Sequence, residues 1–392
     1  MHKVSFMSFG IKMNKISKFF RKVSNVIKLI RKGIIDKEIT IYSEGRDYWS
    51  HLESLVLTIL NDSDLSICFI TSCENDPAFD IKHSKFDCFY IGNGILRDFV
   101  FQSLNTKVVV LTMPDLNQFT VKRSRHEVHY VYVQHSLVSL HMIYRDGAFN
   151  YYDTICCAGP HHVREFRAIE EKFNLADKII LEHGYSNLDN LINNNLIQKE
   201  ENKIESFEFK KILIAPSWGP SCLIESGLCI NLIDELISSG YEVILRPHPE
   251  TIKRSNSKIE EIMDLRITES SFYIDQDIFG LGSFKESDLM ISDWSGVALE
   301  YSLAFFKPVI FCDLPRKINN PNYEDIKIEP LESKIREEIG MIWDCSTPIG
   351  EKIKSCKNIS KEKILEIRDK YIFNSGSSDC VLKDYLLRNF YS

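Results

Sequence analysis

Short apolar runs alternate with stretches of helical periodicity along most of the chain. Runs rich in valine, isoleucine and aromatic residues predict buried strands, and apolar residues recurring every three or four positions between them predict helices. The predicted strands of the first half are Ile39–Tyr42, Ser66–Thr71, Cys88–Ile91, Val108–Thr112, Tyr130–Gln134, Thr154–Ala158 and Lys178–Glu182. The predicted helices are His51–Leu60, Ile95–Leu104 and His161–Phe173. Repeated strand–helix units predict a mostly parallel sheet with helices on both faces.

A second series with the same alternation follows. Its predicted strands are Lys211–Ala215, Tyr241–Leu245, Ser271–Ile274, Leu289–Ser292 and Val309–Cys312. Its predicted helices are Leu228–Ser238, Lys258–Met263 and Val297–Phe306, and the tail Lys361–Ser392 is also predicted to be helical. The polar stretch Asn190–Phe209 between the two series has no strand pattern and is the predicted linker. The fold class is therefore α/β, with two doubly wound, Rossmann-like domains over residues 38–195 and 207–370.

The first 37 residues differ from the rest of the chain. They hold ten lysines and arginines and one acid, Asp36, although the net charge of the whole chain is −7. From Asn14 to Ile35, apolar residues recur at spacings of three and four, and most lysines fall on the other side. Residues 1–37 are therefore predicted to form a basic amphipathic helix at an anionic membrane surface, although a packing helix with a basic solvated face remains the alternative.

Composition narrows the class of protein. An apolar fraction of 44% over 392 residues predicts a globular protein of two domains. The negative net charge gives no reason to expect nucleic acid as a partner. No signal peptide or apolar run of membrane-spanning length is found, and the 11 cysteines lack zinc-site spacing. We therefore expect a cytoplasmic protein, peripheral on the inner face of the membrane.

Two strands of the second series end in residues suited to bind phosphate. The strand Tyr241–Leu245 runs into Arg246-Pro247-His248-Pro249, where two prolines stiffen the turn that carries the histidine. The strand Leu289–Ser292 runs into Asp293-Trp294-Ser295-Gly296 before a predicted helix. Open α/β sheets bind ligands at the carboxyl ends of their strands, and helix N-termini attract phosphate. The residues predicted to bind donor phosphates here are Arg246, Ser292, Asp293, Ser295 and Gly296. Both groups also have a structural alternative. Arg246 could brace the turn against backbone carbonyls, and the serine cluster could cap the predicted helix.

These two segments resemble the CDP-glycerol glycerophosphotransferases, which build teichoic acids and related polysaccharides. The resemblance rests on Arg-Pro-His-Pro and on Ser-Asp-Trp-Ser-Gly-(x)3-Glu-Tyr-(x)5-Lys-Pro-Val-Ile-Phe. It spans roughly residues 125 to 330 and is most specific over 241–313. A weaker match is Ala215-Pro216-Ser217-Trp218, and His135 lies where the family has His-Gly, with Ser136 in place of the glycine.

The resemblance implies a GT-B fold, with the active site in a cleft between two domains. It implies that His135 is the base on the acceptor hydroxyl and that His248 assists the departing phosphate. It also implies that Glu300 holds a ribose and that residues 371–392 form a helix packed back on the first domain. Ser217, Trp218 and Gly219 follow the first strand of the second series and are expected to touch the nucleotide or its phosphates, although Trp218 could equally be a core aromatic.

Three further histidines and one acidic pair have no assigned role at this stage. His141, His161 and His162 could act in the site or serve structure, and the last two could cap a helix. Asp275-Gln276-Asp277 is an Asp-x-Asp of the kind that binds Mg²⁺, but the motif is weak and in the wrong architecture. We therefore expect no metal and no cofactor, and no P-loop or dinucleotide motif is present.

The sequence thus predicts a transferase of the cell envelope. It would move glycerol phosphate or a similar polyol phosphate from a CDP-activated donor to a hydroxyl of a polysaccharide, teichoic acid or capsule, or of its lipid-linked precursor. Two alternatives stay open. One is a GT-B glycosyltransferase that uses a nucleotide sugar in capsule or O-antigen synthesis. The other is a catalytically silent subunit that binds polysaccharide or a partner enzyme.

Overall fold

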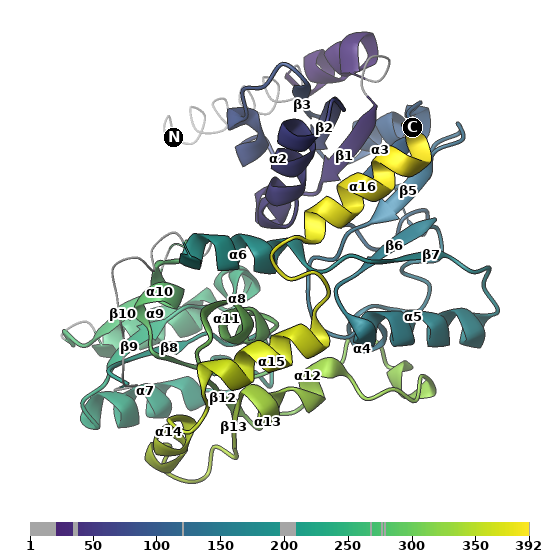
Figure 1. The fold of residues 1–392 in the computed structure, drawn as a ribbon. Helices are drawn as coiled ribbons and strands as arrows, with labels where there is room; N and C mark the ends of the chain where they lie inside the picture. Colours follow the sequence, from purple (N-terminus) through teal and green to yellow (C-terminus); the bar gives the residue numbers. More distant parts are fainter. Residues whose placement is uncertain are drawn as a thin grey trace, which may run out of the picture.

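The computed structural model describes residues 21–33, 38–119, 121–196, 209–266, 269–275, 277 and 280–391. The described chain forms two parallel sheets, each covered by helices on both faces, one above the other in Figure 1. This arrangement confirms the predicted GT-B-like pair of doubly wound domains. Among the described residues, no helix is both long enough and apolar enough to cross a bilayer.

The first sheet has seven strands in the order β3-β2-β1-β4-β5-β6-β7. The strands are β1 (Ile39–Ser43), β2 (Ile67–Thr71), β3 (Phe86–Tyr90), β4 (Val108–Leu111), β5 (His129–Tyr132), β6 (Thr154–Cys157) and β7 (Ile179–Glu182). Most are fully buried, which explains their continuous apolar runs. The accompanying helices are η2 (Arg46–His51), α2 (Glu53–Asp62), η3 (Pro77–Asp80), α3 (Ile95–Ser103), α4 (Leu140–Ile143), α5 (Pro160–Phe173) and α6 (Ser186–Leu196). Helix α6 occupies the start of the predicted linker, so the linker prediction was wrong before residue 197.

The second sheet has six strands in the order β10-β9-β8-β11-β12-β13. They are β8 (Lys211–Ile214), β9 (Glu242–Leu245), β10 (Phe272–Ile274), β11 (Leu289–Ser292), β12 (Val309–Cys312) and β13 (Gly340–Trp343). The helices are α7 (Leu228–Ser238), α8 (Pro249–Arg254), α9 (Asn256–Arg266), α10 (Gly282–Glu286), α11 (Val297–Phe305), η4 (Tyr323–Asp325), α12 (Leu331–Lys334), α13 (Arg336–Ile339), α14 (Gly350–Cys356), α15 (Lys361–Tyr371) and α16 (Ser378–Phe390). The edge strand β13 and the short helices α12 to α14 were not predicted.

The strand order places a topological switch point in each sheet. In the first sheet β2 and β4 flank β1, and in the second β9 and β11 flank β8. Connections leave on opposite faces at such a point, which opens a crevice at the carboxyl ends of the strands. The residues that follow β1 (Arg46–His51) and β11 (Asp293–Gly296) therefore border two crevices, and the two crevices face each other.

The C-terminal helix α16 returns from the second domain to the first, where it lies beside α2 (Figure 1). Its side chains Leu382 and Leu386 are fully buried in the core shared with α2. The crossing segment is held by backbone contacts, because Phe373 N–H donates to the Ala158 carbonyl at 2.9 Å. Gly159 approaches the same segment so closely that a Cβ there would lie 1.8 Å from the Tyr371 carbonyl oxygen.

The described part of the N-terminal segment is helical. Residues 21–28 form an α-helix that continues as the π-turn η1 (Leu29–Gly33). Val26 and Leu29 are buried in the core of the first domain, whereas Ile27 and Ile30 are each 43% exposed. The apolar side chains of this helix are therefore divided between the core and the surface. The remainder of the predicted helix, residues 14–20 and 34–35, lies outside the described residues.

Candidate active site

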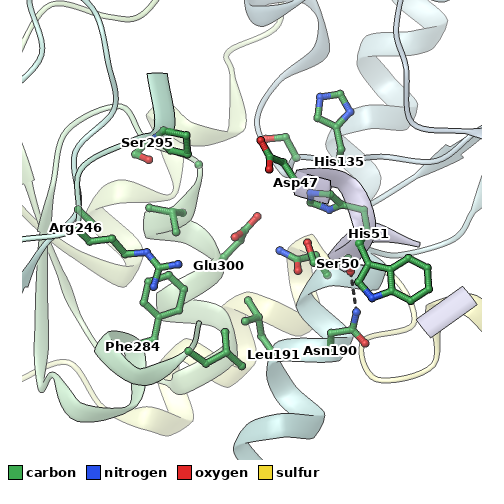
Figure 2. Close-up of a pocket in the computed structure, with 18 of the residues that line it drawn as sticks. Asp47, Ser50, His51, His135, Asn190, Leu191, Arg246, Phe284, Ser295 and Glu300 are labelled. Carbon is green, nitrogen blue, oxygen red and sulfur yellow. Dashed lines mark hydrogen bonds between the residues drawn. The ribbon is translucent and has the colours of Figure 1, made fainter. Parts of the chain in front are cut away.

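One cavity of about 530 Å³ lies between the two domains and is lined by both. The first domain contributes residues of η2, of α6 and of the turn that follows β5. The second domain contributes the turns that follow β8 and β9 and the N-terminus of α11. Figure 2 shows Asp47, His51 and His135 on one side and Arg246, Ser295 and Glu300 on the other.

His135 follows β5 and is held by tyrosine hydroxyls at both ring nitrogens. The Tyr132 hydroxyl lies 3.1 Å from Nδ1 and the Tyr144 hydroxyl 3.1 Å from Nε2. A neutral imidazole donates at one nitrogen and accepts at the other, and hydroxyls can serve both. Burial lowers the pKa of His135 to about 4, so the ring is neutral at pH 7. It is thereby oriented and unprotonated, as a base must be.

Ser136 does not disturb this turn. Its backbone does not adopt a positive φ, so the position has no conformational need for glycine. The Ser136 hydroxyl lies across the cleft from the second domain, 3.3 Å from where a Cβ on Gly296 would stand. Glycine at 296 therefore allows the N-terminus of α11 to come close to the first domain.

His51 also lines the cavity and was not singled out from the sequence. Its ring centroid lies 6.2 Å from that of His135 and 5.7 Å from that of Tyr185. Burial, with a smaller effect of His135, lowers the pKa of His51 to about 3. Its buried Nδ1 makes no hydrogen bond within the described structure. The two histidines therefore form a neutral, aromatic patch on the first-domain wall.

His248 ends the turn after β9 and caps helix α8. Its Nδ1 accepts a hydrogen bond from the Glu250 N–H at 3.1 Å, which places the ring proton on Nε2. Burial, followed by the nearby Lys317, lowers the pKa of His248 to about 4. The neutral ring therefore has an N–H to donate at Nε2 and carries no positive charge at pH 7.

Arg246 lines the cavity but is also tied to the loops beside it. Its Nη1 donates to the Gly280 carbonyl at 2.8 Å and the Ser283 hydroxyl at 2.9 Å, and it pairs with Asp275 at 3.2 Å. The guanidinium stacks over the Phe284 ring at 4.5 Å. The bracing reading of Arg246 therefore has direct support, and Asp275 of the Asp-x-Asp pair is its ion-pair partner. Among the described residues, no group of three or more His, Cys, Asp or Glu side chains is arranged to hold a metal ion.

The N-terminus of α11 opens into the cavity. Ser295, Gly296 and Val297 all line it. The first amides of a helix have no partner within the helix, and its dipole is positive at that end. An anionic group in the cavity would therefore meet the N–H groups of this turn and the Ser295 hydroxyl.

Ser292 and Asp293 are not among the residues that line the cavity. The Ser292 hydroxyl is buried and donates to the Ala215 carbonyl at 2.7 Å. The buried Asp293 carboxylate accepts from the Ser217 N–H at 2.6 Å and the Leu223 N–H at 3.1 Å. Both residues thus fasten the turn after β8 to the turn after β11, and the structure does not support direct phosphate contact by either.

Ser217 and Trp218 lie beside the cavity and not in its wall. The buried Ser217 hydroxyl accepts from Lys317 Nζ at 2.8 Å. Two cations lie over the Trp218 ring, with Lys317 Nζ at 4.5 Å and Arg254 Cζ at 5.0 Å from its centroid. Lys317, which was not predicted, is the cation nearest to this group, and no local sequence motif marks it.

Glu300 lines the cavity from the first turn of α11, but it is engaged by the first domain. The Tyr185 hydroxyl donates to its Oε1 at 2.7 Å, and Asn187 adds a hydrogen bond. Burial raises the pKa of Glu300. The carboxylate thus links the two domains at the cavity. A ribose bound there would have to share the carboxylate oxygens with Tyr185 and Asn187.

The histidines left open by the sequence have structural partners. His161 and His162 lie inside α5, each with Nε2 3.0 Å from a backbone carbonyl, of Leu137 and Val138 respectively. His141 is buried with its Nδ1 3.2 Å from Glu165. None of the three lines the cavity. The contacts of His161 and His162 with Leu137 and Val138 instead support the loop that follows His135.

The comparisons with known proteins support the enzyme class. Residues 149–314 match the family described as CDP-glycerol:poly(glycerophosphate) glycerophosphotransferase. This match confirms the resemblance seen in the sequence and the prediction of a glycerophosphotransferase-like enzyme. No curated protein matched the chain in a sequence search.

Solved structures show the same fold at low sequence identity. A variant of the wall teichoic acid polymerase TagF, soaked with CDPG, superposes with a TM-score of 0.57 at 17% identity. The match covers 100% of this chain and 98% of that chain. UDP-GlcNAc 2-epimerase from Methanocaldococcus jannaschii matches with a TM-score of 0.54 at 13% identity, over 89% of this chain and 99% of that chain.

Proposed function

We propose that this chain, with a glycerophosphotransferase match over residues 149–314, transfers glycerol phosphate from CDP-glycerol to an acceptor hydroxyl in the synthesis of a teichoic acid or capsule polysaccharide. One observation carries the proposal. A single cavity holds His135 on one wall and His248 with the N-terminus of α11 on the other. We assign residues 38–195 to the acceptor side and 207–370 to the donor side.

The reaction follows from this arrangement. The acceptor oxygen attacks the phosphorus that bears glycerol, its proton passes to His135, and a new P–O bond forms. The bond from this phosphorus to the bridging oxygen breaks, and CMP leaves with that oxygen and the electron pair. The Nε2–H of His248 and the amides of α11 stabilise the charge that develops on the phosphates.

The direct test is release of CMP. Purified protein should release CMP from CDP-glycerol in the presence of a hydroxyl acceptor and form an acceptor–phosphoglycerol product seen by mass spectrometry. UDP-sugars under the same conditions should give no transfer. Turnover of a nucleotide sugar, with CDP-glycerol inert, would contradict the proposal.

Ser295→Asp is expected to weaken donor binding strongly, because it puts a negative charge where the phosphates meet the first turn of α11. Ser295→Ala removes one hydroxyl and should cost about 1 kcal/mol, roughly fivefold in Kd. The Asp variant should lose clearly more than the Ala variant, measured by calorimetry with CDP-glycerol. Ser360→Asp, at the exposed N-terminus of α15, is the matched control. Equal affinity of Ser295→Asp and wild type would exclude α11 as the phosphate site.

We also propose that the N-terminal helix holds the enzyme at an anionic membrane surface. Ile27 and Ile30 are exposed beside the exposed cations Lys28 and Arg31. This pairing of apolar and basic side chains suits the interface of an anionic bilayer. Because Val26 and Leu29 belong to the core, removal of the whole helix would also damage the fold.

Point substitutions therefore test the membrane proposal better than a deletion. Ile27→Glu combined with Ile30→Glu should lower binding to phosphatidylglycerol vesicles by roughly tenfold or more, through lost apolar burial and added repulsion. Ile318→Glu changes a side chain of the same exposure, 43%, in the second domain and should have no effect. Sedimentation with vesicles is the measurement, and unchanged binding of the double variant would refute the proposal.

A further inference from the structure

We propose that the acceptor is an uncharged saccharide and not a chain of glycerol phosphates, an inference that rests on the function proposed above. The acceptor would be held by the first-domain wall of the cavity, which is formed mainly by η2 and α6, with Glu53 of α2, Pro77 of η3 and His135 beside them. Figure 2 shows Asp47 and His51 of η2 with Asn190 and Leu191 of α6. Nothing in the donor chemistry decides between these two acceptors, so the argument depends on this wall alone.

The charge of the wall is unsuited to a polyanion. Its charged side chains are one arginine, Arg46, against two carboxylates, Asp47 and Glu53. The two histidines on this side, His51 and His135, are neutral because burial lowers the pKa of both. A glycerol phosphate chain carries one negative charge per unit, and the net negative charge of this wall repels it. A neutral sugar meets no such repulsion.

The hydrogen-bonding groups of the wall suit hydroxyls. Helix α6 presents Asn187, Asn190 and Asn194 to the cavity, at spacings of three and four that place them on one face. Asn190 Nδ2 donates to the Ser50 carbonyl at 2.7 Å, and Asn194 Nδ2 donates to the Asn190 carbonyl at 2.8 Å. These bonds orient the two side chains and leave their Oδ1 atoms as acceptors.

Acceptor atoms discriminate between the two ligands. A sugar ring donates through several hydroxyls to amide or carboxylate oxygens, whereas each unit of a glycerol phosphate chain has one free hydroxyl beside a diester group that has only acceptor oxygens. The Oδ1 atoms of the asparagines and the Asp47 and Glu53 carboxylates therefore favour a polyhydroxylated ligand. Leu191 and Pro77 add apolar surface to the same wall, against which the C–H face of a sugar ring can pack.

The test compares two acceptors of equal length with CDP-glycerol as donor. The first is a neutral disaccharide with an alkyl aglycone, and the second is a glycerol phosphate dimer with the same aglycone. We expect kcat/KM for the disaccharide to be at least tenfold higher. Asp47→Asn, which removes one carboxylate, should narrow this preference.

Variants of α6 locate the binding surface. Asn194→Ala should raise KM for the disaccharide while the Kd for CDP-glycerol stays unchanged. Asn193→Ala, on the same helix but not in the cavity wall, is the control and should leave both constants at wild-type values.

Binding measured separately distinguishes the failure of this inference from that of the proposed function. Donor binding is followed by calorimetry with CDP-glycerol, and acceptor binding by NMR in the presence of CMP. A protein that binds CDP-glycerol but prefers the glycerol phosphate dimer overturns the acceptor inference alone. A protein that binds no CDP-glycerol overturns the proposed function, and with it this inference.

Discussion

His135→Ala is expected to reduce turnover by 10²–10⁴-fold, the usual loss on removing a general base, with the Kd for CDP-glycerol near the wild-type value. The reason is geometric: His135 lies on the wall opposite the residues that would hold the donor, and two tyrosine hydroxyls fix its ring. Single-turnover release of CMP and calorimetry measure the two quantities. His126→Ala, an exposed histidine before β5, is the control and should be silent.

The pH profile gives a second check on the same residue. A base works only when unprotonated, so the rate falls as the pH drops through its pKa. Because burial lowers the pKa of His135 to about 4, the acidic limb should lie near pH 4, well below the ordinary histidine value of 6.5. A His135→Ala enzyme retaining more than about a tenth of wild-type turnover would refute the assignment. The neighbouring His51 would then be the residue to test.

Gly159→Ala is expected to destabilise the protein by roughly 3 kcal/mol or more, at the upper end of overpacking effects. Gly159 has an extended backbone that alanine could adopt, so conformation is not the cause. The new Cβ would lie 1.8 Å from the Tyr371 carbonyl oxygen and 2.8 Å from its carbon. These are backbone atoms of the segment that carries α16 to the first domain, and they cannot move without displacing it.

Gly45→Ala is the matched control for this prediction. Gly45 is also extended, at φ 174°, and a Cβ there meets nothing within 4 Å. Its free energy of unfolding in urea should change by no more than about 1 kcal/mol. Equal stabilities of the two variants would contradict the prediction. They would show that the segment between α15 and α16 can move away from position 159 at little cost in free energy.

The inner strands could be predicted because a parallel sheet covered on both faces buries nearly all of their side chains. Leu289–Ser292 and Val309–Cys312 are found with the bounds predicted, since all four residues of each are buried and apolar or small. The edge strand Gly340–Trp343 escaped prediction because only two of its four residues are buried and it begins with glycine. Short helices such as Arg336–Ile339 have too few turns to show a period.

The sequence could predict which kinds of residue lie near the site, but not which way their side chains point. The run Ser292 to Gly296 correctly marks the helix N-terminus, yet the hydroxyl of Ser292 turns to the neighbouring strand while Ser295 faces the cavity. His51 was passed over because it follows a strand by a short 3₁₀ turn and carries no motif. Its place beside His135 depends on the packing of η2 against α6, which no local pattern contains.

The return of α16 to the first domain reverses the usual order of events on the ribosome. Domains generally fold in the order of their synthesis, the N-terminal one first. Here the core around Leu55 and Ile59 of α2 includes Leu382 and Leu386, which are translated only after the second domain. The domain made first is thus completed only after the second domain has been made, and its nascent chain exposes an uncovered apolar face until α16 has been translated.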